Sequence, residues 1–286
     1  MWKLTLQDTL VQVARRSRNR VREHAFRRDV GTIRQWRWIA DAVRRYFSGE
    51  IRGWPHVPTR GPMLLVGNHS GGLLMPDVYV LLSAWWSERF EQPLYLMAHD
   101  LLFLVPLFES LARAVGVVPG RLDYAEKLIA EGQAVLLFPG GEEEVFRPFT
   151  QRNQIQFGGR MGFVRLALRH RVPVVPVVSY GAQDVNLFLS RGHDAARLLQ
   201  LKRMRVDILP LVAGLPFGLV PGFTPLLPLP TKITLEFQPA LRWPELEPEA
   251  AADPRTVTRC YNQVVDCMQR ALWRLADERP NPFSRR

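Results

Sequence analysis

The sequence has little cysteine. Of its 286 residues, only Cys260 and Cys267 are cysteines. They are seven residues apart in a segment with helical periodicity, which separates them by roughly 10 Å, too far for a disulfide. Their spacing also fits no metal site. We therefore expect two core cysteines in a reducing, cytosolic setting, with neither a disulfide framework nor a bound metal.

The sequence also lacks the marks of a secretory leader and of a spanning helix. Its N-terminus has no apolar stretch between a charged start and a cleavage site. The run from Ile208 to Pro230 carries no charge and is long enough to cross a bilayer. It contains six prolines, which would break a spanning helix repeatedly. We expect an apolar loop that packs on the core or contacts lipid.

Acidic residues are fewer than basic ones: 27 Asp and Glu stand against 38 Lys and Arg, so the formal net charge is +11. Residues 1–53 hold 13 Lys and Arg against 5 Asp and Glu. Four apolar residues there, Trp36, Ala40, Val43 and Phe47, fall on one helical face. A solvated basic helix is the simpler alternative, but aromatic anchors beside arginines favour an anionic membrane surface. No nucleic-acid signature accompanies the charge, so residues 1–60 are predicted to be a basic, helical, membrane-associating segment that ends in a linker.

Residues 61–286 show short apolar runs that alternate with helical periodicity. The expected strands are Met63–Val66, Leu94–Met97, Ala134–Phe138, Val172–Val178 and Lys232–Phe237. The expected helices are Asp77–Trp86, Asp123–Glu131, Arg160–His170 and Thr256–Ala276. This order predicts an α/β fold with a mixed, largely parallel sheet flanked by helices, preceded by the basic amphipathic segment and closed by a C-terminal helix.

One histidine stands in a glycine-rich loop. Met63–Val66 is followed by Gly67-Asn68-His69-Ser70-Gly71-Gly72, and Asp77 begins the next apolar run. Histidine takes up a proton near neutral pH, and a carboxylate can orient it. Taken alone, the loop is as typical of a structural histidine as of a catalytic one.

Two further segments stand out beside that loop. An apolar run ends in Phe138-Pro139-Gly140-Gly141, followed by three glutamates. The plain interpretation is a strand-ending turn with a solvated helix start, which the helix dipole favours. Gly159–His170 is the second segment, an amphipathic helix pattern that leads into a buried strand.

In this order, the segments resemble the glycerolipid acyltransferase superfamily, which includes lysophospholipid and diacylglycerol acyltransferases. His69 and Asp77 are similar to its His…Asp motif, although seven residues lie between them where four are usual. The other similar blocks are Gly116–Arg121, Phe138–Gly141 with Glu144, and Arg160–Ala167 followed by Val174–Val177. The resemblance covers roughly residues 60–240 and makes residues 61–286 an acyltransferase domain.

The resemblance implies acyl transfer from acyl-CoA, as a co-substrate, to a lipid hydroxyl, with no other cofactor. His69 would act as the base, and Asp77 would fix its tautomer. Backbone N–H groups near Ser70–Gly72 would stabilise the oxyanion. The expected substrate-binding residues are Ser70, Gly71, Gly72, Arg121, Pro139, Gly140, Gly141, Glu144 and Arg160.

The third block predicts a neutral acceptor. It lacks the Glu-Gly-Thr-Arg pattern of enzymes that act on phosphate-bearing acceptors, and its glutamates would repel a phosphate. Mono- or diacylglycerol, or a long-chain alcohol, is therefore favoured. Arg121 and Arg160 would attract a phosphate, so a lysophospholipid (1-acylglycerol-3-phosphate) acyltransferase is the close alternative.

Two other classes of protein stay open. A serine esterase would use Ser70, but the Gly-x-Ser-x-Gly elbow is absent. A non-catalytic protein would use only the basic N-terminus and the Ile208–Pro230 run to bind membranes. The favoured interpretation is a membrane-associated enzyme at the cytoplasmic face.

Overall fold

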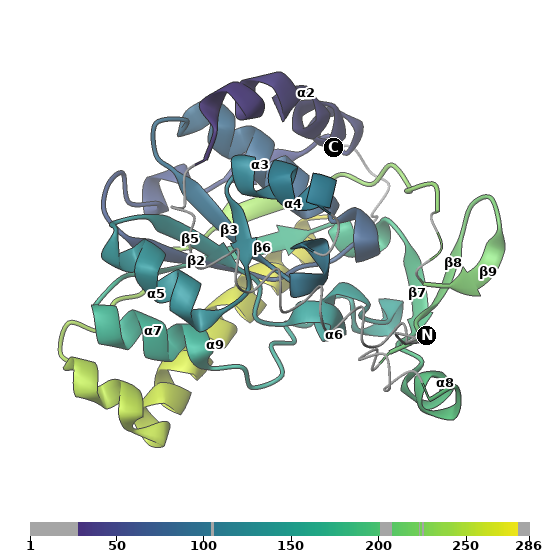
Figure 1. Ribbon diagram of the computed structural model, residues 1–286. Coiled ribbons are helices and arrows are strands. Elements are labelled where there is room, and N and C mark those ends of the chain that lie inside the picture. Colours follow the sequence, from purple (N-terminus) through teal and green to yellow (C-terminus); the bar gives the residue numbers. More distant parts are fainter. Residues whose placement is uncertain (1–27, 104–105, 201–207, 223, 225, 280–286) are drawn as a thin grey trace, which may run out of the picture.

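The computed structural model describes residues 28–103, 106–200, 208–222, 224 and 226–279. A seven-stranded sheet forms its centre, in the order β1-β10-β6-β2-β5-β3-β4 (Figure 1). Its strands are β1 Glu50–Arg52, β2 Met63–Gly67, β3 Leu94–Ala98, β4 Val117–Pro119, β5 Ala134–Leu137, β6 Val174–Tyr180 and β10 Thr234–Phe237. β10 runs antiparallel to β6, and the other neighbouring pairs are parallel. The predicted mixed, largely parallel α/β sheet is therefore confirmed.

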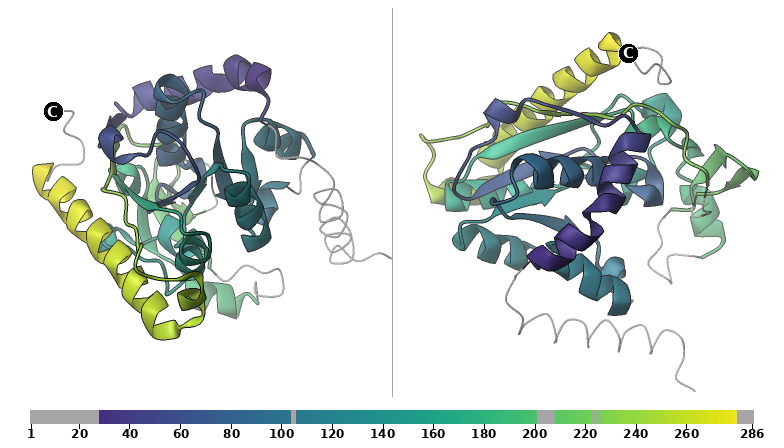
Figure 2. Two further views of the ribbon diagram at one scale, coloured as in Figure 1. Left: turned by 90° about the vertical axis from the view of Figure 1, so that its left-hand side faces the viewer. Right: turned by 90° about the horizontal axis from the view of Figure 1, so that it is seen from above.

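Helices cover both faces of this sheet (Figures 1 and 2). The helices of the described residues are α2 Val30–Tyr46, α3 Pro76–Glu88, α4 Pro106–Ala114, α5 Leu122–Ala130, α6 Gly141–Val145, α7 Gly162–His170, α8 His193–Leu198 and α9 Pro254–Glu278, of which α8 lies away from this sheet. The short 3₁₀ turns are Trp54–His56, Gly72–Leu74, Asp100–Phe103, Phe149–Gln151, Ala182–Asp184 and Pro248–Ala252. The closing helix predicted over Thr256–Ala276 is α9, which is slightly longer than expected.

The central strands are apolar because both of their faces are buried. Met63 and Leu65 of β2 pack into the cluster that includes α2 and α3. Leu64 and Val66 point the other way, into the cluster with α5, α7 and α9. A strand with two buried faces needs an uninterrupted apolar run rather than an alternating one. This burial holds the carboxyl end of β2 rigidly in the middle of the sheet.

The segment before residue 60 differs from the expected one. The predicted apolar face of α2 exists, but its Ala40 and Phe47 are buried in the core beside α3, whereas Trp36 is exposed. β1 overlaps the start of the linker predicted over residues 51–62 and pairs in parallel with β10. α2 and β1 therefore pack with the α/β unit, because the same apolar side chains stabilise the core. Residues 1–27 lie outside the described residues, so a membrane role for that stretch stays a prediction.

The Ile208–Pro230 run also differs from the expected loop. It contains an antiparallel hairpin, β8 Leu211–Gly214 and β9 Gly218–Pro221, and β8 also pairs with β7 Leu187–Ser190. Of its prolines, Pro210 precedes β8, Pro216 lies in the turn and Pro221 ends β9, where no ladder hydrogen bond is lost. In the described part of the chain, no helix has the length and apolarity that a membrane span requires.

Candidate active site

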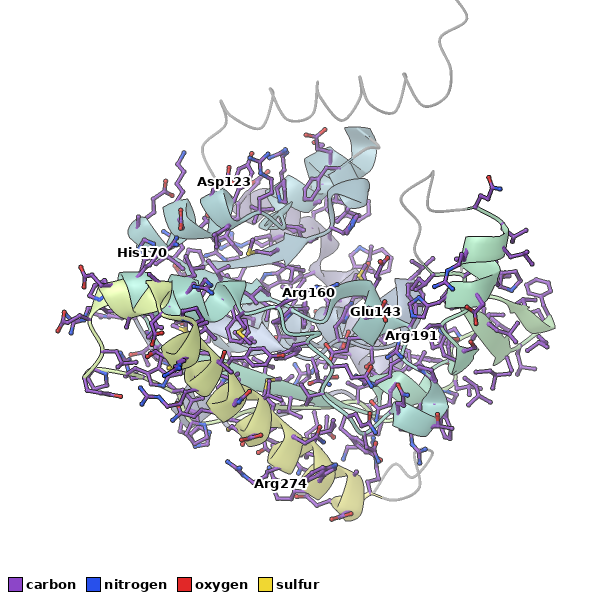
Figure 3. The ribbon with its side chains drawn as sticks, turned by 90° about the horizontal axis from the view of Figure 1, so that it is seen from below. Asp123, Glu143, Arg160, His170, Arg191 and Arg274 are labelled. Carbon is purple, nitrogen blue, oxygen red and sulfur yellow. The ribbon has the colours of Figure 1, made fainter. Side chains whose placement is uncertain are left out.

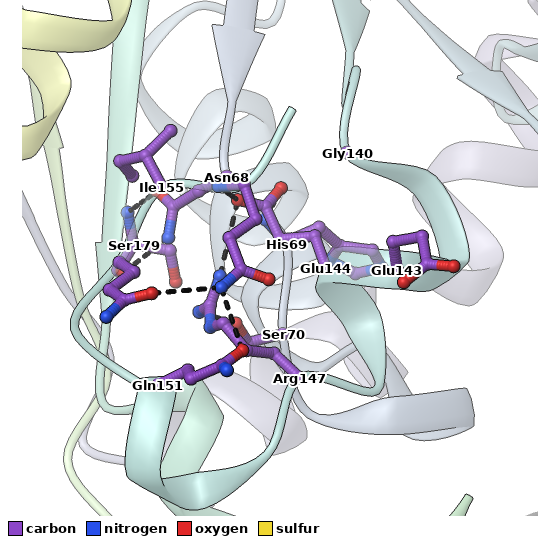
Figure 4. Close-up of polar contacts among 12 residues, drawn as sticks. Asn68, His69, Ser70, Gly140, Glu143, Glu144, Arg147, Gln151, Ile155 and Ser179 are labelled. Carbon is purple, nitrogen blue, oxygen red and sulfur yellow. Dashed lines mark hydrogen bonds and ion pairs between the residues drawn. The ribbon is translucent and has the colours of Figure 1, made fainter. Parts of the chain in front are cut away.

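The loop after β2 carries His69 at the carboxyl end of the sheet. Asn68 fixes the start of this loop, since its side-chain amide donates to the Ser179 carbonyl and accepts from the Ser179 N–H, at 2.9 and 2.8 Å (Figure 4). The His69 ring stacks on Phe138, which follows β5, with 4.7 Å between ring centroids. His69 is buried, and its position is set by β2, β5 and β6 together.

Asp77 faces His69 from the first turn of α3. Its Oδ2 lies 3.0 Å from His69 Nδ1 and accepts the Ser70 N–H at 3.0 Å. The Val78 N–H donates to Oδ1 at 2.9 Å, so the buried carboxylate has several partners. The structure thus brings the two predicted residues into contact despite their seven-residue separation.

The chain closes this separation with a tight turn. Gly71 has a φ of 92° and is followed by the 3₁₀ turn Gly72–Leu74, and Met75 has a φ of 49°. A Cβ on Gly71 would lie 2.6 Å from Pro76 Cδ. Glycine is required there both by the left-handed backbone and by the close approach of Pro76.

The electrostatic surroundings of His69 favour a charged imidazole. Burial lowers the pKa of His69, but the carboxylates around it, Asp77 foremost, raise it by more, so the net pKa lies above the ordinary histidine value. Glu144 raises the pKa further, and Arg147 opposes it. His69 is therefore a stronger base than a free histidine.

Glu144 is the buried member of the three successive glutamates. Its carboxylate accepts the His69 N–H at 3.2 Å and the Gln156 N–H at 3.1 Å. It pairs with Arg147 Nη1 at 3.3 Å. Burial raises the pKa of Glu144 to about 7, against the lowering effect of Arg147 and the two N–H donors. Glu144 therefore anchors the backbone of the histidine loop. It is not a solvated residue at a helix start, as the plain interpretation of the sequence had it.

Arg147 completes this network, and sequence reasoning missed it. It is buried, and its Nη2 donates to the Ser70 hydroxyl at 3.0 Å and to the Arg152 carbonyl at 3.2 Å (Figure 4). Burial lowers the pKa of Arg147, and Glu144 counteracts this. In the sequence Arg147 resembles any surface arginine. The available signal was its spacing of three from Glu144, which puts both side chains on one helical face.

Arg160 and the Pro-Gly-Gly turn form one unit. The Arg160 Nη1 donates to the carbonyls of Pro139 and Gly140. A Cβ on Gly140 would lie 2.4 Å from Glu144 Oε2, and Gly141 has a φ of 55°. The turn therefore needs glycine for space and conformation. Arg160, expected to bind substrate, uses hydrogen bonds to hold this turn.

Arg121 lies elsewhere. It pairs with Asp123 through Nε and Nη2 at 3.0 and 2.7 Å and stacks over Tyr124 at the start of α5. Asp123 lies at the outer edge of α5, apart from Arg160 and Glu143 (Figure 3). The structure therefore does not bring Arg121 together with the His69 cluster.

The expected oxyanion donors are partly used within the protein. The Ser70 N–H donates to Asp77, and the Ser70 hydroxyl accepts a hydrogen bond from Arg147. Of the predicted stretch Ser70–Gly72, this leaves the N–H groups of Gly71 and Gly72 for a developing oxyanion.

Comparison with known proteins identifies relatives of this chain. The acyltransferase family model matches residues 49–180. An uncharacterized protein of Mycobacterium tuberculosis is 30% identical over 240 residues, 84% of this chain and 65% of that protein. Human diacylglycerol O-acyltransferase 2 is 30% identical over 86 residues, 29% of this chain and 22% of that protein. The chain thus spans about two thirds or less of the length of these curated relatives.

The fold has a solved counterpart. The crystal structure of the 1-acyl-sn-glycerophosphate acyltransferase from Thermotoga maritima matches 93% of this chain and 88% of its own, with a TM-score of 0.50 and 15% identity. This likeness concerns the fold alone. The family model and the sequence relatives confirm the resemblance to the glycerolipid acyltransferase superfamily, and residues 49–180 match the acyltransferase family.

Proposed function

We propose that the chain transfers a fatty acyl group from acyl-CoA to the hydroxyl of a neutral lipid, such as mono- or diacylglycerol or a long-chain alcohol. The observation that carries this proposal is the buried contact between His69 Nδ1 and the Asp77 carboxylate. With Nδ1 donating to Asp77, the lone pair of Nε2 is available to accept a proton. A general base beside a glycine loop is what an attack by an alcohol needs.

The reaction follows from this tautomer. His69 Nε2 removes the hydroxyl proton as the acceptor oxygen attacks the thioester carbon. Asp77 stabilises the resulting imidazolium, and Gly71 and Gly72 supply N–H groups to the oxyanion. Collapse of the tetrahedral intermediate breaks the carbon–sulfur bond, and the imidazolium returns its proton to the leaving thiolate. The acceptor oxygen takes the place of an enzyme nucleophile, so no acyl-enzyme forms.

The charge near His69 supports a neutral acceptor. Arg147 is the buried cation that contacts the cluster, and its guanidinium is engaged by Glu144, Ser70 and the Arg152 carbonyl. Arg160 is held by two carbonyls of the Pro-Gly-Gly turn. A phosphate monoester would meet the buried carboxylates of Asp77 and Glu144 with these cations already paired.

The described contacts of Ser70 argue against a serine esterase. A nucleophilic serine needs a base within hydrogen-bond reach of its oxygen. Here the Ser70 hydroxyl accepts a hydrogen bond from Arg147, and no hydrogen bond among the described residues joins it to the His69 ring. The arrangement suits a base for an external alcohol better than a base for Ser70.

The test is transfer of labelled acyl groups from acyl-CoA to a panel of acceptors. We expect ester formation with monoacylglycerol, diacylglycerol or a long-chain alcohol, and loss of activity in His69→Ala. The matched control is His170→Ala, which changes an exposed histidine on α7. Transfer to lysophosphatidic acid alone would contradict the neutral acceptor, and an acyl-enzyme on Ser70 would contradict the mechanism. Full activity in His69→Ala would remove the proposed base.

We further propose that the enzyme acts at the cytoplasmic face of a membrane, where its lipid acceptor resides.

A further inference from the structure

The small sheet β7-β8-β9 is apolar on both faces. Its register puts Phe188 opposite Val212, and Val212 opposite Val220. These three side chains form the inner face and pack with Phe146 and Ile208 in a core cluster of their own. Packing of the inner face therefore explains why this sheet folds onto the main body. It does not explain why the outer face is apolar as well.

The outer face carries mostly exposed leucines, with the exposed Ser190 opposite Leu211 as its polar member. Ala213 pairs with Leu187 on one side and with Leu219 on the other, so these residues share the outer face. Leu219 is 60% exposed, and Leu215 and Phe217 in the hairpin turn are 59% and 63% exposed. Leu189, Leu211 and Leu227 are also exposed. We call these six exposed side chains the hairpin patch: Leu189, Leu211, Leu215, Phe217, Leu219 and Leu227.

The composition of the patch is unusual for a surface in water. An antiparallel sheet with one solvated face normally alternates apolar residues inward and polar residues outward. Here the run 208–230 contains no charged residue at all. The hairpin also projects from the body rather than lying on it (Figures 1 and 2). A contiguous, projecting apolar surface indicates a partner that is itself apolar.

The patch is directly connected to the candidate active site. A Cβ on Gly72 would lie 2.8 Å from the Phe188 ring on the inner face of the same sheet. Leu73, which follows Gly72, is also exposed. Residues around β7 reach the site as well, since the Asn186 side chain donates to the Gly71 carbonyl at 3.4 Å. The sheet that presents the patch therefore packs against the glycine loop after His69.

A second link joins the patch to the glutamate helix α6. Arg191, just after β7, donates to the Glu143 carbonyl at 3.0 Å and pairs with its carboxylate at 3.1 Å. Figure 3 shows Glu143 and Arg191 close together where α6 meets the loop after β7. The Phe146 and Phe188 rings also meet edge to face, with 5.5 Å between their centroids. The position of the hairpin relative to the site is thus fixed from two sides.

We propose that the hairpin patch docks the protein onto a lipid bilayer by inserting among the upper acyl chains, which turns the His69 loop toward the membrane surface. A bilayer is the occupant that fits, because the patch offers neither charge nor side-chain hydrogen-bonding groups to a polar partner. Elements that lie in a membrane interface bury their apolar face about 5–10 Å deep. The inference rests on the proposed function in one respect: the neighbouring site takes a lipid.

The test measures binding of the full chain to phosphatidylcholine vesicles by sedimentation, at low salt and in about 1 M NaCl. High salt screens the attraction of basic residues but leaves apolar insertion intact. We expect the wild type to stay bound in high salt. The double variant Phe217→Ser, Leu219→Ser should bind about 100-fold more weakly, since each buried side chain of this size contributes about tenfold.

The matched controls change exposed apolar residues elsewhere. Leu122→Ser on α5 and Trp273→Ser on α9 remove comparable surface and should leave vesicle binding unchanged. α5 lies at the other end of the molecule from the hairpin (Figure 1). A loss of less than about threefold in the double variant, or an equal loss in the controls, would overturn the proposal. So would a wild-type dimer that dissociates in the double variant, since the patch would then be covered by a second copy.

A separate assay keeps this inference distinguishable from the proposed function. With a water-soluble short-chain diacylglycerol as acceptor, the double variant should transfer acyl groups as fast as the wild type. With diacylglycerol in vesicles its rate should fall with binding. If vesicle binding depends on the patch but the wild type transfers to no acceptor, docking stands and the proposed function fails. If transfer is normal on vesicles despite the substitutions, docking fails and the function stands.

Discussion

His69 Nδ1 lies 3.0 Å from Asp77 Oδ2, although seven residues separate the two along the chain. The left-handed Gly71 and Met75 on either side of a 3₁₀ turn bring the ends of this segment together. Asp77 then accepts backbone N–H groups of both Ser70 and Val78, so the carboxylate fixes the loop as well as the ring. A spacing of seven residues, in place of the four usual in the His…Asp motif, is thus compatible with a direct contact between the histidine and the aspartate.

Asp77→Asn should lower transfer by roughly two to four orders of magnitude, because the amide cannot stabilise the imidazolium. It should also move the pH profile. Transfer needs neutral His69, so the rate rises as pH increases through the pKa of His69. Burial lowers that pKa, and the carboxylates around His69, Asp77 foremost, raise it to a net value above the usual one. Losing the carboxylate should therefore shift the acid limb to lower pH.

Steady-state rates across pH check this prediction. Asp123→Asn is the control, since Asp123 is an exposed carboxylate in the first turn of another helix, α5. An acid limb that stays in place in Asp77→Asn would mean that another group sets the profile.

The sequence was informative about the site where chemistry and local spacing coincide. His69, Asp77 and Glu144 were all named from short motifs, and each lies in the buried cluster. Arg147 was missed because its contact with the histidine loop, through the Ser70 hydroxyl, joins residues 77 apart in the sequence. Arg121 pairs with its neighbour Asp123, apart from this cluster, and its expected substrate-binding role stays a prediction.

Glu144→Gln should change how stability depends on pH. Burial raises the pKa of Glu144 to about 7 from its usual 4.5. The folded protein therefore binds this proton more tightly than the unfolded chain. The carboxyl imposes no cost below about pH 4.5, and its cost grows to about 3 kcal/mol as pH rises to about 7. The wild type should lose stability relative to Glu144→Gln over that range.

Urea unfolding of both proteins at several pH values measures this difference. Glu126→Gln, which changes a partly exposed glutamate on α5, should run parallel to the wild type. Parallel curves for Glu144→Gln would show that Glu144 titrates normally in the fold.

The sequence predicted the fold best where burial leaves a clear pattern. β2, β3 and β5 were placed within about a residue because strands covered on both faces are continuous apolar runs. β1 was missed, because three residues between a glycine turn and a proline-rich stretch are too few to show a hydrophobic periodicity. The prolines of the 208–230 run predict a loop, although Gly214 and Gly218 mark the turn of the β8–β9 hairpin.

Gly140→Ala should disturb the site by steric pressure alone. The new Cβ would lie 2.4 Å from Glu144 Oε2 and 2.5 Å from its Cβ, so Glu144 must move. Overpacking of this kind costs about 1–3 kcal/mol. Because Glu144 accepts the His69 N–H, the variant should also lose acyl transfer. Gly162→Ala is the control: nothing lies within 4 Å of its added Cβ. A Gly140→Ala protein with wild-type stability and rate would show that Glu144 has room to move.

The last prediction compares two arginine–glutamate pairs that differ in burial. Arg147 and Glu144 are almost fully buried, whereas the Arg169 and Glu126 side chains, 3.1 Å apart, are 49% and 35% exposed. Removing Arg147 leaves the Glu144 charge and the Ser70 hydroxyl without their partner, so Arg147→Ala should cost about 3–5 kcal/mol of unfolding free energy. Arg169→Ala should cost about 0–1 kcal/mol, since water replaces its partner. Chemical unfolding at one pH measures both. If Arg147→Ala were as mild as Arg169→Ala, the buried network would not hold the histidine loop. If Arg147→Ala unfolds at a lower urea concentration but keeps the KM and the acid limb of the pH–rate profile, Arg147 acts on stability alone. A shifted acid limb would tie Arg147 to the electrostatics of His69.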